Sequence, residues 1–293
     1  MSDKILAIDL GGTHYRAGLA TSDDPAAVQP IGEWSAPDSR EAFVGMLSGQ
    51  LAELGATRLG IGIPGLARDV VCLWVPNLPY LDGLDLEASL PGTAIGLGND
   101  AQLALLAEAS AGAALGLSDA ILLAVGTGIG SAVLSGGRIV AGAHGGACSF
   151  GWASADLDDR GEDRSGWLER HASGRALDAA ARSIGLANGT ALVGAARRHD
   201  AAARAALEPP TRALGTALAG AVALLDPEAI ILAGGVAASL DILAPLIVEP
   251  LRRNLPPHLR SIALRPGQFG PRAGLVGAAF AGARGSSWRN HHG

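Results

Sequence analysis

Cysteine is nearly absent from this chain of 293 residues, which contains only Cys72 and Cys148. Two cysteines cannot form a disulfide framework or a thiolate metal site, so a reducing environment is expected. Aromatic residues are also scarce, at 4% of a chain that is 48% hydrophobic. The core must therefore consist mainly of Ala, Leu, Val and Ile, and the 42 glycines predict close packing of helices on sheets.

Three further absences narrow the class of protein. The net charge is −6 and no basic stripe is visible, which argues against nucleic acid as the main partner. No apolar run approaches the length of a membrane span. The first residues, MSDKILAIDL, lead directly into a strand and do not resemble a signal peptide. We therefore expect a cytoplasmic protein with no nucleic-acid and no membrane partner.

One motif occurs twice, as ILAIDLGGTHYRAGLA and ILLAVGTGIGSAVL. Each copy reads as an apolar strand, a glycine turn that carries a threonine, and a return strand. The turns are Gly11-Gly12-Thr13 and Gly126-Thr127-Gly128, and a third glycine pair, Gly234-Gly235, follows the apolar strand Ala229–Ala233. The duplication implies two similar domains, each presenting its turn to a shared cleft.

Glycine turns of this kind let backbone N–H groups approach phosphate oxygens closely. A single such turn would be interpreted as a plain hairpin, because short glycine motifs are weak signals. Three turns that each follow an apolar strand favour phosphate binding. No Walker loop, G-x-x-x-x-G-K-[ST], occurs in the chain.

Two carboxylates stand at the ends of predicted strands. Asp100 follows the strand Ala94–Gly98 and Asn99, and a helix is expected from Ala101. It is either a helix N-cap, the preferred role for Asp on local sequence alone, or a catalytic base. Asp9 ends the first strand and can hold Mg²⁺ through water, since Mg²⁺ keeps most of its hydration.

Hydrophobic spacing predicts the remaining elements. The first part of the chain is expected to contain a helix over Glu41–Leu54 capped by Ser39 and strands over Leu59–Ile63 and Val70–Val75. In the second part, helices are expected over Leu168–Ser173, Ala176–Ser183, Thr190–Leu207, Thr211–Leu225 (started by Pro209-Pro210), Ile242–Asn254 and Leu275–Ala283. Gly285–Gly293 is expected to be a frayed tail, with His291 and His292 disordered rather than bound to metal.

The motifs ILAIDLGGT, GIGIPG, PNLP, GNDAQLALLAE, AVGTGIG, LDPEAIILAGGVA and GLVGAAFAGA occur in the order seen in the ROK family of bacterial sugar kinases. The chain resembles that family over almost its whole length, and GGTHYR and LERHASG are also similar to the neighbouring bacterial glucokinase group. The resemblance implies an α/β, two-domain actin/hexokinase/Hsp70-like ATPase fold with duplicated mixed sheets. We expect an N-terminal small domain over 1–115, completed by a C-terminal helix at about 273–284, and a large domain over 116–272, with a tail over 285–293.

The same resemblance implies ATP-dependent phosphoryl transfer with Mg²⁺. Asp100 resembles the base that accepts the proton of the acceptor hydroxyl. The sugar contacts implied are Asn99, Glu169, Asn77 and Gly65. The phosphate contacts implied are Asp9, Gly11, Gly12, Thr13, Gly126, Thr127 and Gly128, and Gly234 and Gly235 match the segment under the adenosine. Two of the sugar contacts have an alternative interpretation. Asn77 can instead have a structural role in its loop, and Glu169 can be an ordinary exposed carboxylate on a helix.

The chain departs from the family pattern at the sugar wall. Ser149 and Trp152 stand where the family carries a Glu and a His. The family's zinc cysteines are missing from RGEDRSGWLE, Arg160–Glu169, so no zinc is expected. That loop is expected to be held by packing of Trp152 and Trp167. Ion pairs among Asp159, Arg160, Asp163 and Arg164 are also expected to hold the loop. The alternative is that these charged side chains are simply solvated.

These observations predict ATP-dependent phosphorylation of a hydroxyl, the exocyclic 6-OH or its equivalent, on a hexose or modified sugar. Loss of two polar partners at the sugar wall leaves an amino or N-acyl sugar or a C7-cyclitol as alternatives to glucose. A non-catalytic sugar- or nucleotide-binding regulator is the alternative of another class. Retention of Asp100 and of all phosphate turns speaks against that regulator. Repressor relatives carry an N-terminal helix-turn-helix, which is not expected here because the first strand starts at about Lys4. Relatives are often dimers, and the Ala-rich helices permit a homodimer.

Overall fold

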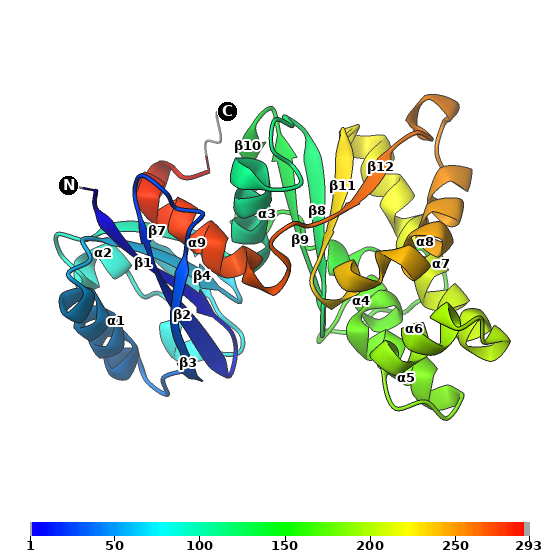
Figure 1. The fold of residues 1–293 in the computed structure, drawn as a ribbon, viewed down its shortest axis with the longest axis horizontal. Helices are drawn as coiled ribbons and strands as arrows, with labels where there is room; N and C mark the ends of the chain where they lie inside the picture. The colour runs from blue at the N-terminus through cyan, green and yellow to red at the C-terminus, as the bar shows by residue number, and fades with distance from the viewer. Residues whose placement is uncertain (1, 290–293) are drawn as a thin grey trace. The chain divides into compact units, whose positions relative to one another are not determined.

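The computed structural model describes residues 2–289, and their contacts separate into two compact units (Figure 1). The first unit comprises Met1–Leu117, Ala132–Ala147 and Pro271–Gly293, and the second comprises Ser118–Ser131 and Cys148–Gly270. The segment Ala132–Ala147 was expected in the second domain but packs with the first unit. Each unit is described by itself.

The first unit is built on a five-stranded mixed sheet with strand order β3-β2-β1-β4-β7. Its strands are β1 (Lys4–Leu10), β2 (His14–Thr21), β3 (Gln29–Ser35), β4 (Arg58–Ile63) and β7 (Ala94–Asn99). Around them lie α1 (Arg40–Leu54), α2 (Leu86–Ser89), α3 (Asp100–Ala111), α9 (Ala273–Arg284), the hairpin of β5 (Leu66–Arg68) and β6 (Val71–Trp74), and the short helices η1 (Pro79–Leu81), η5 (Gly270–Arg272) and η6 (Gly285–Ser287).

Strands β1, β4 and β7 run parallel, so their carboxyl ends meet at one edge of the sheet. The register places Asp9 of β1 opposite Gly62 of β4, and Gly62 opposite Gly98 of β7. Residues that follow these positions are therefore neighbours in space. This edge carries the polar residues that the sequence singled out at the strand ends.

Glycines let α9 lie directly on one face of the sheet. A Cβ at Gly60 would lie 1.7 Å from the carbonyl oxygen of Ala278, and one at Gly96 would lie 2.2 Å from that of Ala281. Because side chains alternate along a strand, the opposite face is free to carry large residues. Buried side chains of that face form one hydrophobic cluster with α1, including Leu6, Ile8, Leu59, Ile61, Phe43 and Leu47.

The second sheet repeats the topology of the first, with strand order β10-β9-β8-β11-β12. Its strands are β8 (Ala120–Val125), β9 (Ile129–Ser135), β10 (Arg138–Ile139), β11 (Ala229–Ala233) and β12 (Ala263–Pro266). In each sheet, the first three strands of the repeat lie side by side in reverse chain order. Two later strands then extend the sheet, parallel to the first strand of the repeat. The duplicated mixed sheet expected from the repeated motif is confirmed.

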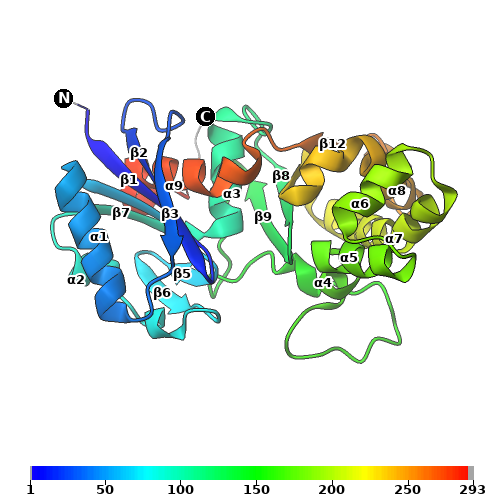
Figure 2. The ribbon, with the colours of Figure 1, turned by 60° about the horizontal axis from the view of Figure 1, so that its bottom comes forward.

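The second unit contributes most of the helices (Figure 2). They are η2 (Phe150–Trp152), α4 (Trp167–Ala172), α5 (Gly174–Ser183), α6 (Gly189–Arg197), α7 (Ala201–Leu225), η3 (Gly235–Ser239), α8 (Leu240–Arg253) and η4 (Pro257–Leu259). None of the helices within residues 2–289 has the length and apolar character needed to cross a membrane.

The prediction of one helix over Thr190–Leu207 and a new helix after Pro209-Pro210 is wrong. The chain breaks earlier, at Asp200, whose side chain caps the start of α7. Helix α7 then continues through both prolines. Its buried face is unbroken on both sides of them, and the Thr211 hydroxyl donates to the carbonyl of Leu207 at 2.7 Å. Packing thus overrides the local cost of the missing N–H groups.

The prediction of a frayed tail from Gly285 is also wrong for the part that the structure describes. Residues 285–287 form η6, and Trp288 is 0% exposed. The Trp288 indole donates to the carbonyl oxygen of Leu97 on β7 at 2.9 Å. The predictions for His291 and His292 lie outside the described residues.

Candidate functional site

The junction between β7 and α3 carries Asn99 and Asp100. Asn99 is the N-cap, because its Oδ1 accepts the N–H of Ala101 at 3.0 Å. Its Nδ2 donates to the carbonyl of Gly65 at 3.1 Å, which ties the junction to the chain that follows β4. Asp100 is the first helical residue rather than the cap. The N-cap interpretation of Asp100 is therefore wrong by one residue.

Asp100 is restrained at the start of α3 through its carboxylate. Its Oδ1 accepts the Ala101 N–H at 2.7 Å, and the residue is exposed. Displacement of water by the surrounding protein raises the pKa of Asp100 to about 6, and the charge of Asp9 raises it too. The Ala101 N–H opposes this effect. A carboxylate with these properties is mostly ionised near neutral pH and ready to take a proton.

Asp9 lies at the end of β1, on the same edge of the sheet. Its side chain is 21% exposed, and its Oδ2 lies 4.0 Å from Nη1 of Arg16. Burial raises the pKa of Asp9, Arg16 lowers it, and Glu33 raises it. A Cβ at Gly274 would lie 2.9 Å from Asp9 Oδ1, so the first turn of α9 can approach this carboxylate only because Gly274 is a glycine.

The first glycine turn lies beside Asn77. The N–H of Gly11 donates to the carbonyl of His14 at 2.8 Å, which closes the turn. A Cβ at Gly12 would come within 3.0 Å of the Asn77 Cβ. Thr13 is exposed, and its hydroxyl lies 3.0 Å from Nδ1 of His14. The structure therefore brings the turn and the predicted Asn77 together within the first unit.

The second glycine turn is held by Glu169. The turn is closed by the Gly126 N–H, which donates to the Gly128 carbonyl at 2.9 Å. Glu169 Oε2 accepts the N–H of Ile129 at 3.1 Å, and its Oε1 accepts from Arg175 at 2.7 Å. A Cβ at Gly128 would lie 2.6 Å from Glu169 Oε2. Glu169 is thus neither free nor an ordinary exposed carboxylate, and its predicted contact with sugar stays a prediction.

A cavity of about 170 Å³ lies in the second unit next to this turn. Its polar and glycine lining includes Gly126, Gly174, Asp178, Thr190, Gly235 and Ser239. The Gly174 N–H donates to the Gly126 carbonyl at 2.7 Å, and a Cβ at Gly174 would lie 2.5 Å from that oxygen. The second glycine turn therefore opens directly onto this cavity.

Gly234 and Gly235 act differently at this cavity. Gly234 has a φ of +76°, and a Cβ there would lie 2.5 Å from the carbonyl of Val125. That position therefore demands a glycine. Gly235 meets no atom within 4 Å of its Cβ position, so its backbone is open to the cavity that it lines.

The two residues that depart from the family pattern are both exposed. Ser149 precedes η2, and Trp152 ends it with 54% of its surface exposed. Trp167 is buried instead, and its ring stacks on His171 with centroids 4.7 Å apart. The expectation that Trp152 packs to hold the loop is therefore wrong.

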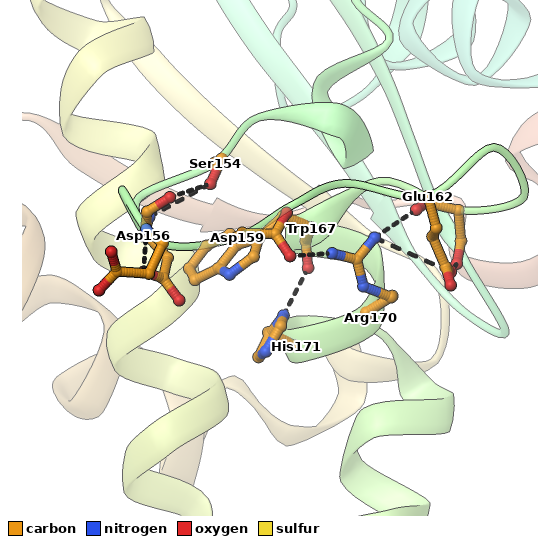
Figure 3. Close-up of polar contacts among 9 residues, drawn as sticks. Ser154, Asp156, Asp159, Glu162, Trp167, Arg170 and His171 are labelled. Atoms are coloured by element: carbon orange, nitrogen blue, oxygen red, sulfur yellow. Dashed lines mark hydrogen bonds and ion pairs between the residues drawn. The ribbon is translucent and has the colours of Figure 1, made fainter.

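Arg170 of α4 is the residue that holds this loop (Figure 3). Its guanidinium donates to Asp159 and to the carbonyl of Ser165, both at 2.6 Å, and lies 3.8 Å from Glu162. Asp159 was predicted to take part in ion pairs, but its partner is this helix residue. Bonds from Arg170 of α4 to Asp159 and Ser165 thus fix the loop at two points.

We expect Arg170→Ala to destabilise the protein by about 1–2 kcal/mol, because the partly buried Asp159 carboxylate and the Ser165 carbonyl lose a charged donor. The loop should also become more sensitive to proteolysis. Arg160→Ala, at an exposed position of the same loop, is the matched control and should change neither property. Urea unfolding and timed limited proteolysis measure both effects. Equal cleavage rates in the two variants would contradict the role of Arg170.

Several residues of these sites were not found from the sequence. Arg175 and Asp178 lie in a helical segment where spacing alone gives no functional signal. The neighbouring pair Ser173-Gly174 did stand out in the LERHASG motif. Gly274 and Trp288 lie far along the chain from the residues that they contact, so only the fold brings them into the site.

The residues fit a magnesium ion better than a structural metal. Within residues 2–289, no group of three or more His, Cys, Asp or Glu side chains is placed to hold a metal. The lack of zinc itself stays a prediction. Mg²⁺ needs only one or two carboxylates when phosphates and water supply the other ligands. Asp9 suits that role, since a carboxylate whose pKa is raised by burial gains stability from a nearby cation.

Comparison with known proteins gives a consistent result. The profile described as the ROK family matches residues 5–283. An N-acetylmannosamine kinase from Shigella flexneri is 31% identical over 291 residues, covering 94% of this chain and 97% of the relative. A kanosamine kinase from Amycolatopsis mediterranei is 29% identical, covering 94% and 95% of the two chains.

A solved structure from the same family is also similar to this chain. The ROK family glucokinase from Streptomyces griseus, crystallised with glucose and AMPPNP, superposes with a TM-score of 0.78 and 26% identity. The match covers 97% of this chain and 100% of that one. It confirms the expected α/β ATPase fold with mixed sheets. The chain belongs to the ROK family and is a sugar kinase of that family.

Proposed function

We propose that the protein transfers the γ-phosphoryl group of ATP to the exocyclic 6-hydroxyl of an amino sugar, free or N-acylated. The observation that carries the proposal is Asp100, an exposed residue at the start of α3 whose Oδ1 accepts the Ala101 N–H. Support for the acceptor class comes from the relatives named for N-acetylmannosamine and kanosamine.

Asp100 serves as the general base in this proposal. The acceptor hydroxyl donates to the carboxylate oxygen that Ala101 does not use, and its proton passes to Asp100 as the O–P bond forms. Phosphoryl transfer depends mainly on alignment and on charge stabilisation. The bond from Ala101 and the cap at Asn99 provide that alignment, because both fix the start of α3.

The nucleotide is assigned to the glycine turns and to the cavity of the second unit. Backbone N–H groups of Gly11, Gly12 and Gly126–Gly128 would face phosphate oxygens, with the Thr13 and Thr127 hydroxyls as further donors. Gly234 and Gly235 would face the adenosine. Asp9 would hold Mg²⁺ through water, and that ion neutralises charge on the phosphates. The Arg16 guanidinium lies 4.0 Å from the Asp9 carboxylate and favours its ionised form.

The acceptor contacts that we propose are Asn99, Asn77, Ser149 and Trp152. Asn99 lies directly before Asp100 and is tied to Gly65 through its amide, and Asn77 lies beside the first turn. In the second unit, Ser149 and Trp152 are both exposed. A serine and an indole face offer fewer hydrogen-bond partners to ring hydroxyls than a Glu and a His would, which supports a modified sugar as the acceptor.

A coupled ADP-release screen over hexoses, amino sugars, N-acyl sugars and cyclitols tests this function. We expect the highest kcat/KM with an amino sugar or its N-acyl derivative, and NMR of the product should locate the phosphate on the exocyclic oxygen. A preference for glucose or for a cyclitol would overturn the acceptor class. ATP binding without turnover on any of these compounds would favour the regulatory alternative.

The pKa of Asp100 predicts an acid limit to activity. Since the pKa is raised to about 6, kcat/KM should be nearly constant above pH 7 with respect to this group. It should fall about tenfold per pH unit below pH 6 as the base is protonated. The charged groups around it are Asp9 and, beside Asp9, Arg16 and Glu33. Initial rates from pH 5 to pH 8, with folding checked by circular dichroism, measure the limit. A limit near the ordinary Asp pKa of about 4 would contradict the assignment.

A further inference from the structure

The C-terminal segment Gly285–Arg289 folds onto the edge of the first sheet. Trp288 is 0% exposed, and its indole N–H donates to Leu97 O at 2.9 Å. Strand β7 is the last strand of its sheet, so carbonyl groups along its open side need donors from elsewhere in the chain. Trp288 supplies the donor for the carbonyl of Leu97, which lies two residues before Asn99 in the chain.

The indole also packs against the backbone of Gly98. A Cβ at Gly98 would lie 2.7 Å from Cζ2 of Trp288 and 2.7 Å from Cδ2 of Leu103. Leu103 belongs to the first turn of α3, so Gly98 lies between two large side chains. A glycine is required at this point because both side chains occupy the space that a Cβ would take. The strand end is thereby held immediately before Asn99 and Asp100.

Arg289 fastens the same segment at two further points. The Arg289 carbonyl accepts the N–H of Ile139 at 3.0 Å. Its guanidinium lies over the Trp288 ring, 4.5 Å from the centroid, and reaches the Ala67 carbonyl at 3.5 Å. The tryptophan is therefore held from the backbone side and from above its ring, as expected for a side chain with a fixed position.

We propose that Trp288 is a positioning residue for the phosphoryl transfer, because its indole fixes the backbone from which Asn99 and Asp100 project. This inference rests on the proposed function. It assigns to a residue near the C-terminus the role of keeping the base in line with the acceptor hydroxyl. The side chain itself touches neither the carboxylate nor, in this proposal, either substrate.

Trp288→Phe is the informative variant, since it keeps an aromatic ring but leaves Leu97 O without its donor. We expect kcat to fall on the order of tenfold to a hundredfold, because small displacements of a catalytic group have effects of this size. The KM for ATP should not change. The acid limit of kcat/KM should move to lower pH as Asp100 becomes better hydrated.

Phe43→Leu provides the matched control. Phe43 is also 0% exposed in the first unit, but it lies on α1 and belongs to the hydrophobic cluster on the face of the sheet opposite α9. Both variants are compared in unfolding free energy, kcat, KM, pH profile and hydrogen exchange of the Ala101–Leu103 amides. Only Trp288→Phe should lower kcat and accelerate exchange at these amides, beyond any common loss of stability.

Two results would overturn the inference: Trp288→Phe with unchanged kcat and pH profile, or losses no greater than those of Phe43→Leu. Unaltered exchange at the start of α3 would do the same. Failure of the proposed function is a separate outcome, recognised when the unmodified protein phosphorylates none of the sugars. Hydrogen exchange then still decides whether Trp288 holds the strand-to-helix junction.

Discussion

Asp100→Asn is expected to lower kcat by about 10²- to 10⁴-fold, the usual contribution of a general base, while ATP binding is retained. The amide can keep the bond from the Ala101 N–H through its oxygen, so the geometry at the start of α3 should survive. It cannot accept the proton of an acceptor hydroxyl. The measurement is kcat by ADP release, together with ATP affinity by calorimetry.

The same variant should be at least as stable as the unmodified protein. Asn99, not Asp100, caps α3, so no cap is lost. The pKa of Asp100 is raised from 3.8 to about 6, and a carboxylate with a raised pKa disfavours the folded state when ionised. With respect to this group, stability is lower above pH 6 and increases as the pH falls from 6 towards 3.8. Activity and stability thus oppose each other at this residue.

Asp23→Asn is the matched control, because Asp23 belongs to the same unit and its carboxylate lies in the loop between β2 and β3. It should leave kcat, ATP affinity and stability unchanged. An Asp100→Asn variant that keeps normal kcat would remove Asp100 from the mechanism. One that unfolds would show instead that the carboxylate is structural.

Much of the fold could be predicted because its signals are local. The repeated strand–turn–strand motif contains its own turns, so both sheets were expected from neighbouring residues. Strand β3 was missed, since its exposed edge position leaves no apolar run, and Trp34 only reveals its role by stacking on Tyr15 at 5.2 Å. The prolines of α7 led to a wrong prediction of the helix boundary. Their unfavourable helix propensity is a local property and does not reveal the packing that offsets it.

The candidate site shows the same division. Asn99, Asp100, Asp9 and the glycine turns stand directly at strand ends, where the sequence singles them out as candidates. Trp288 is almost two hundred residues from its partner Leu97. No local pattern distinguishes a tryptophan in a Gly/Ser-rich segment that packs on a sheet edge from one in a tail. Long-range packing of this kind becomes visible only in the fold.

The close packing of α9 on a strand glycine predicts a second large effect, on stability. Gly60→Ala should destabilise the protein by about 3 kcal/mol or more. The added Cβ would lie 1.7 Å from the Ala278 carbonyl oxygen of α9. A Cβ has no rotamer by which to escape, so either α9 or β4 must move. Helix α9 crosses the strands whose ends carry Asp9 and Asn99, so the displacement should also reduce activity in the fraction that stays folded.

Gly45→Ala is the matched control for this argument. Gly45 lies exposed inside α1, and no atom stands within 4 Å of its Cβ position. There the same substitution should stabilise the protein by about 0.5–1 kcal/mol, because alanine loses less backbone entropy in a helix than glycine does. Urea unfolding of both variants tests whether the sign depends on the space next to each glycine. If Gly60→Ala cost no more than an ordinary surface change, α9 could not be in direct contact with β4, and the glycine-dependent layer that supports the strand ends would be wrong.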